Sequence, residues 1–155
     1  MEELKNRITE IYYNNETLTN SEFLKISNQL IDGLNLGVIR SAEKDHTGKW
    51  KVNIWVKQGI LLLFKYGRLS DMSVNESFRY FDKDSLPLHP LDINDNIRIV
   101  PGGSSIRTGS YIAPSVICMP PMYINIGSYV DEGTMIDSHA LVGTCAQLGK
   151  RIHLS

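Results

Sequence analysis

Apolar residues recur at every sixth position over the last third of the chain. The chain is 42% apolar, so the probability that ten positions spaced six apart are all apolar by chance is roughly 2 in 10,000. Allowing any of the six possible starting positions raises this probability to roughly 1 in 1,000. An amphipathic helix needs a period near 3.6, and the four prolines and seven glycines of this stretch would interrupt long helices. The series is Val100, Ile106, Ile112, Cys118, Ile124, Val130, Ile136, Val142, Leu148 and Leu154.

This period is typical of the hexapeptide repeats of a parallel β-helix, in which each six residues form a short strand and a turn. Three such units complete a coil, so residues 18 apart should stack. Ile106, Ile124 and Val142 would form one internal column, and residues 112, 130 and 148 another. Residues 100–155 supply about three coils. Left-handed winding is implied by the resemblance to known hexapeptide helices, since spacing alone does not show it. The fourth residue after each apolar one is mostly small; the set is Ser104, Ser110, Val116, Ser128, Thr134, Ala140 and Ala146, with Met122 and Ile152 larger.

The preceding region has the patterns of a mixed α/β domain. Apolar residues at helical spacing predict a helix over residues 2–13 and a second one capped by Ser21 and closed by Gly37. A third helix is predicted over residues 53–66.

Short strands and a loop are expected between and after these helices. Strands are predicted at 38–43 and 49–52 around a turn at 45–48, and a loop at 82–96. The predicted organisation is an α/β N-terminal domain over 1–97 followed by the first coils of a left-handed parallel β-helix, truncated, over 98–155.

Charge and composition exclude several classes of protein. The 16 basic and 17 acidic residues give a net charge of −1, which argues against nucleic acid as the main partner. Residues 60–64 form the longest apolar run, too short to span a membrane, and the N-terminus lacks a secretory signal. Two cysteines cannot build a disulfide framework. A cytoplasmic protein is therefore expected, with no membrane partner.

The last residues, 151–155, stop within a repeat and without a cap. An uncapped coil leaves backbone groups and an apolar cross-section exposed. Either something covers that end, or the chain is an N-terminal fragment of a longer protein, which the pattern favours. An inactive, truncated product is a further hypothesis.

Five segments resemble one family in order along the chain. They are Arg98–Pro101, Tyr123–Asp137 and Val142–Lys150 in the repeats, with Arg40–Lys44 and Ser77–Lys83 upstream. Together they are similar to tetrahydrodipicolinate N-succinyltransferase, of the hexapeptide-repeat acyltransferases. The run Tyr-Val-Asp-Glu-Gly-Thr-Met and the segment Thr144–Gln147, which is similar to Ser-Cys-Ala-Gln, carry most of the selectivity.

The resemblance implies a function and an assembly. The family transfers succinyl from succinyl-CoA to the amine of an acyclic form of tetrahydrodipicolinate, in the diaminopimelate route to lysine. It does so as a homotrimer with sites between neighbouring prisms. The expected partners are therefore a small dicarboxylate and succinyl-CoA, a co-substrate, with no cofactor bound. Later coils, which hold CoA and a second acidic residue, are expected to lie outside this chain. The alternative is a hexapeptide acyltransferase with another acceptor.

Asp137 is the candidate catalytic residue. It follows the inward residue Ile136, so it should lie at the start of a turn on the outer surface. The resemblance matches it to the family's aspartate, which receives the substrate's amine. An ordinary aspartate is a weak base, so orientation of the amine is the larger expected role. From spacing alone it would be a turn aspartate that binds backbone N–H groups.

Two arginines are candidates for binding the substrate's carboxylates. Guanidinium binds carboxylate through two parallel hydrogen bonds, and Arg98 matches the family's substrate-contacting arginine. Arg107 could serve similarly and ranks below it. Without the resemblance, both would be ordinary solvent-exposed arginines.

Histidines and cysteines suggest no metal site. Some hexapeptide helices hold zinc with three histidines, but the repeats offer only His139 and His153, for which exposure to solvent is the simpler explanation. His139 is a weaker candidate for a catalytic base, because some hexapeptide acyltransferases use a histidine in that role. Cys118 is expected to be a small core residue, and Gly127, Gly133, Gly143 and Gly149 are expected to be turn glycines with left-handed backbone.

Overall fold

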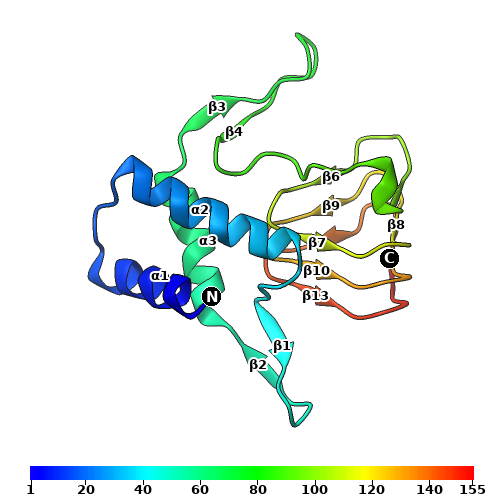
Figure 1. Ribbon diagram of the computed structural model, residues 1–155. Helices are drawn as coiled ribbons and strands as arrows, with labels where there is room; N and C mark the ends of the chain where they lie inside the picture. The colour runs from blue at the N-terminus through cyan, green and yellow to red at the C-terminus, as the bar shows by residue number, and fades with distance from the viewer.

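The first 66 residues form three helices around one apolar core, in a computed structural model that describes residues 1–155 (Figure 1). The helices are α1 (Glu2–Asn14), α2 (Asn20–Asn35) and α3 (Ile54–Tyr66). Ile8, Leu30 and Ile60 are fully buried where the three helices meet. The predicted first and third helices are therefore confirmed.

The start of α2 differs from the prediction. Its N-cap is Thr19, whose hydroxyl accepts a hydrogen bond from the Glu22 backbone N–H while the Glu22 carboxylate accepts one from the Thr19 N–H. Ser21 lies inside the helix instead. The reciprocal bonds need a carboxylate three residues after the cap, and Thr19 meets that spacing whereas Ser21 does not.

A two-stranded antiparallel hairpin joins α2 to α3. It consists of β1 (Ala42–Lys44) and β2 (Trp50–Val52). The predicted strand at 49–52 is essentially confirmed, but the one at 38–43 is wrong over most of its length. Residues before Ala42 turn toward the repeats, because the Ser41 hydroxyl hydrogen-bonds the carbonyls of Gly127 and Cys145.

A second hairpin extends away from the body of the molecule after α3 (Figure 1). It is formed by β3 (Leu69–Asp71) and β4 (Phe81–Lys83), and a 3-10 turn, η1 (Ile93–Asp95), follows. The predicted loop at 82–96 is therefore wrong at its start and around η1. Several large apolar side chains on this hairpin are exposed, including Val74 at 75% and Phe78 at 59%.

The repeats form the predicted left-handed parallel β-helix of about three coils. Its two-residue strands stack as three parallel sheets, ordered β5-β8-β11-β14, β6-β9-β12 and β7-β10-β13. The strands are β5 (Arg98–Ile99), β6 (Ser105–Ile106), β7 (Tyr111–Ile112), β8 (Ile117–Cys118), β9 (Tyr123–Ile124), β10 (Tyr129–Val130), β11 (Met135–Ile136), β12 (Leu141–Val142), β13 (Gln147–Leu148) and β14 (His153–Leu154).

Both predicted columns are present inside the prism. Ile106, Ile124 and Val142 pair in register, as do Ile112, Val130 and Leu148. The predicted six-residue series is wrong only at its first residue, Val100. Ile99, and not Val100, pairs with Cys118, because the connection from β5 to β6 is one residue longer than the others.

Seven corners of the helix contain one residue with left-handed backbone, three positions after an inward residue, whereas the corner after Cys118 has Pro120 and Pro121 instead. The set is Gly109, Ser115, Gly127, Gly133, His139, Cys145 and Arg151. The expectation for Gly127 and Gly133 is confirmed, and that for Gly143 and Gly149 is wrong. In the last two corners the left-handed position falls on Cys145 and Arg151, so the neighbouring glycines have ordinary φ angles.

The helical region packs directly on the β7-β10-β13 face of the prism. Ile126, from the repeats, is fully buried in the core of the helices. The guanidinium of Arg40 lies 3.6 Å from the ring centroid of Tyr129, which stacks on Tyr111 at 4.5 Å, and its Nε donates to Gln147. The two regions are therefore held in one arrangement by shared apolar and polar contacts.

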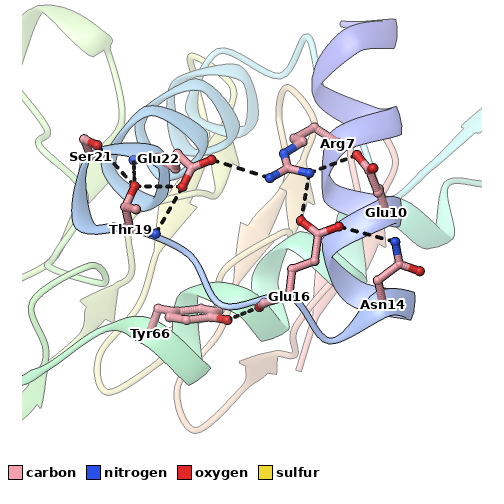
Figure 2. Close-up of polar contacts among 8 residues, drawn as sticks. All are labelled: Arg7, Glu10, Asn14, Glu16, Thr19, Ser21, Glu22 and Tyr66. Carbon is pink, nitrogen blue, oxygen red and sulfur yellow. Dashed lines mark hydrogen bonds and ion pairs between the residues drawn. The ribbon is translucent and has the colours of Figure 1, made fainter.

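An ion-pair cluster ties α1 to the start of α2 (Figure 2). Arg7 contacts the carboxylates of Glu10 and Glu16 at 2.9 Å and that of Glu22 at 3.5 Å. The Tyr66 hydroxyl donates to the Glu16 carbonyl at 2.6 Å. Because these charges are partly exposed, the cluster fixes the path of the chain more than it adds stability.

Candidate active site

Asp137 lies on the outer surface of the prism, directly after β11. Its backbone N–H donates to the Leu154 carbonyl at 2.8 Å, which fixes the residue against the next coil. Its Oδ1 accepts from the Ser138 N–H at 2.8 Å, and its Oδ2 lies 3.2 Å from His153 Nε2. The side chain is 38% exposed, so the carboxylate is held on both oxygens yet remains open to a ligand.

These contacts lower the pKa of Asp137 from its ordinary value near 3.8. The Ser138 N–H is the main cause, and the contact with His153 is the second. Both stabilise the charged form. A carboxylate with a lowered pKa is a weaker base, which favours binding and orientation of an amine over removal of its proton.

His153 is the residue that the sequence interpretation missed. It was expected to face solvent without a role, and its side chain is indeed 61% exposed, but it contacts Asp137. The pairing of the coils could have revealed this contact. Met135 pairs with His153, so the outward side chain of residue 137 is a diagonal neighbour of His153. Diagonal pairs on a sheet are within reach of long side chains.

Arg98 lies on the same sheet as Asp137 and does not contact it. Arg98, Ile117 and Met135 are successive partners across β5, β8 and β11. With strands about 4.8 Å apart, Arg98 is about 10 Å from the strand that leads into Asp137. Its side chain is exposed. A ligand with a carboxylate at one end and an amine at the other could span this gap.

Arg107 has a partner within the chain. Its guanidinium pairs with the Asp82 carboxylate at the base of the β3–β4 hairpin and lies 5.8 Å from the Phe64 ring. This pair joins the hairpin to the first coil. A substrate contact by Arg107 stays a prediction, and it would require this pair to open or to be shared.

No hydrogen bond or ion pair joins the side chains of the remaining candidates to that of Asp137. His139 occupies the left-handed corner position with an exposed side chain, and no three His, Cys, Asp or Glu residues are grouped so as to hold a metal ion. Cys118 is fully buried, and burial raises the pKa of its thiol from 9.0 to about 11. The thiol therefore stays protonated at neutral pH, as expected of a core residue.

A large surface hollow lies away from Asp137. A depression of about 960 Å³ lies between α1 and α2 and includes Arg7 and Glu22 of the ion-pair cluster. The guanidinium of Arg7 is held by three carboxylates, and Lys25 is the other cationic side chain that lines the hollow. None of the three α-helices has the length and apolar composition that crossing a bilayer requires.

Comparison with known proteins decides the family. The family described as tetrahydrodipicolinate N-succinyltransferase N-terminal matches residues 3–66. A 2,3,4,5-tetrahydropyridine-2,6-dicarboxylate N-succinyltransferase of Polynucleobacter asymbioticus is 42% identical over 132 residues, covering 83% of this chain and 47% of the relative. The chain belongs to the tetrahydrodipicolinate N-succinyltransferase family.

Other members of the family match the chain at similar identity, one of them over nearly its whole length. The enzyme of the same name from Bartonella bacilliformis is 39% identical over 162 aligned residues, covering 99% of this chain and 56% of the relative. The enzyme of the same name from Xylella fastidiosa is 43% identical over 134 residues, covering 83% of this chain and 47% of the relative. The chain thus spans about half the length of the curated relatives it matches.

Proposed function

We propose that the complete protein transfers succinyl from succinyl-CoA to the amine of acyclic tetrahydrodipicolinate, on the diaminopimelate route to lysine. The observation that carries this proposal is the match to relatives that bear the corresponding name over most of this chain, including the run that ends at Asp137. Succinyl-CoA is a co-substrate, and the working form is a cytoplasmic homotrimer. These assignments are supported by the family.

The proposed reaction forms a C–N bond and breaks a C–S bond. The amine nitrogen attacks the thioester carbonyl of succinyl-CoA, CoA leaves as its thiolate, and the proton lost by nitrogen neutralises that thiolate. Asp137 holds the amine against the carbonyl, since positioning of the reacting atoms supplies much of the acceleration in such reactions. Arg98 binds a carboxylate of the acceptor.

Release of the CoA thiol by the complete protein, with succinyl-CoA and tetrahydrodipicolinate, tests the role of Asp137. We expect Asp137→Asn to lower kcat by about 100-fold. Asp131→Asn is a matched control, because Asp131 occupies the same corner position and its Oδ1 accepts from the next N–H at 2.8 Å, as Asp137 does. Unchanged turnover in Asp137→Asn, or better turnover with an unrelated amine, would contradict the proposal.

The same assay tests Arg98. We expect Arg98→Ala to raise the KM for the acceptor by about tenfold with a smaller effect on kcat, because the guanidinium binds a part of the substrate that does not react. Arg79→Ala, which removes an exposed arginine from the β3–β4 hairpin, is the control. An effect confined to kcat would assign Arg98 a different role.

A further inference from the structure

We propose that His153 is a positioning residue for the reaction, one that fixes the carboxylate of Asp137 toward the acceptor amine. The inference rests on the proposed function and adds a residue to its site. Its basis is a contact between two coils: His153 on β14 reaches Asp137 at the corner after β11.

The geometry leaves Asp137 little freedom to rotate. One carboxylate oxygen is held by the Ser138 N–H at 2.8 Å and the other by His153 Nε2 at 3.2 Å. A carboxylate has about four acceptor sites, so two contacts leave about two for an amine. The two holding groups belong to different coils, Ser138 to the corner after β11 and His153 to β14, and the plane of the carboxylate is therefore set by the stacking of the coils.

Asp131 shows what the corner alone provides. It also accepts from the following N–H through Oδ1, with no histidine against its other oxygen. The second contact is thus specific to Asp137 and is not a general property of these corners. His153 is more exposed than Asp137, and the pair lies at the surface where a substrate could approach.

Few other charged groups face this pair. Arg98 lies on the same sheet, three strands from His153, and His139 lies two residues after Asp137 on the same corner. The strand partners between Arg98 and His153, Ile117 and Met135, carry no charge. His153 is therefore the group that acts on the Asp137 carboxylate through a side-chain contact.

The test compares His153→Ala with His153→Gln in the complete protein. Glutamine can place an N–H donor near the position of Nε2 without carrying a charge. We expect His153→Ala to lower kcat about tenfold with little change in KM, and His153→Gln to restore most of it. Lys150→Ala is the control, because it removes a 2.8 Å contact with Glu132 between the same two coils at another corner. Full activity in His153→Ala, or an equal loss in Lys150→Ala, would overturn the proposal.

A double variant tests whether His153 acts through Asp137. If it does, the double variant Asp137→Asn, His153→Ala should have the same kcat as Asp137→Asn alone. If the two residues acted independently, their separate losses in kcat would multiply. A further loss of tenfold in the double variant would overturn the positioning role.

A measurement without activity separates this proposal from the proposed function. By carboxyl carbon NMR, we expect His153→Ala to raise the pKa of Asp137 toward its ordinary value, since one stabilising contact is lost. A wild-type protein that does not transfer succinyl would overturn the function. An unchanged pKa of Asp137 in His153→Ala would instead overturn the contact.

Discussion

The corner positions show how strictly the β-helix constrains single residues. Gly127 has φ of 78°, and a Cβ placed on it would lie 2.6 Å from Ile60 Cδ1 and 3.0 Å from Cys145 Sγ. The residue therefore combines a left-handed backbone with close approach to α3. An L side chain there would be strained twice, once by its backbone conformation and once by overlap with the helical core.

We expect Gly127→Ala to lower the free energy of unfolding by about 3 kcal/mol, the sum of the left-handed penalty and a modest overpacking cost. Urea denaturation of the folded chain measures this change. Gly143→Ala provides the comparison, because Gly143 lies in the next coil without a positive φ and a Cβ on it would meet nothing within 4 Å. Equal losses in both variants would show that neither the left-handed backbone nor the close approach at Gly127 has an energetic effect.

At the scale of elements, the start of α2 depends on one pair of side chains. Thr19 and Glu22 each satisfy a backbone N–H of the other, and Glu22 also contacts Arg7 of α1 (Figure 2). The first N–H groups of a helix have no partner within it, so such caps stabilise the helix directly. The same residues also set where α2 begins relative to α1.

Replacement of Thr19 by alanine should lower stability by about 1 kcal/mol, the usual cost of losing a cap. Thermal unfolding followed by far-ultraviolet circular dichroism would detect the change. Ser21→Ala tests the alternative cap, and we expect little effect, because the only hydrogen bond of the Ser21 side chain is to Thr19 Oγ1 at 3.2 Å. A larger loss of stability in Ser21→Ala than in Thr19→Ala would show that Ser21 is the cap of α2.

The elements also show what a sequence can reveal. The columns of the β-helix were predictable because a coil of 18 residues leaves the apolar period visible. The register shift at β5 was not, since Ile99 and Val100 are both apolar and either fits the pattern. Asp137 was predictable as an outward corner residue. Its contact with His153 follows from the same 18-residue spacing of the coils, which pairs residue 153 with residue 135. The pairing of Arg107 with Asp82 depends on where the β3–β4 hairpin lies, which no local pattern encodes.

On the scale of the whole molecule, Arg40 links the helical region to the prism. Its guanidinium stacks on Tyr129 and donates to Gln147, so one side chain spans β10 and β13. A planar guanidinium can stack and hydrogen-bond at once, whereas an ammonium cannot reproduce both contacts. The charge alone is therefore insufficient at this position.

We expect Arg40→Lys to cost about 1 kcal/mol of stability and to change the near-ultraviolet circular dichroism of the stacked Tyr111 and Tyr129 rings. Arg79→Lys offers a matched control, because Arg79 lies 5.3 Å from the Phe81 ring on the exposed hairpin. An unchanged tyrosine signal in Arg40→Lys would contradict the role given to the stack.

The packing of the helices on one side of the prism has a consequence for symmetry. Rings of identical subunits need two different patches on each chain, one for each neighbour. The β7-β10-β13 side is covered, which leaves the side that carries Asp137 and the β6-β9-β12 side, where Leu141 is 63% exposed. These two sides differ in sequence and are not interchangeable. A ring built from them would therefore run in one sense only, clockwise or anticlockwise, as seen from the N-terminal coil.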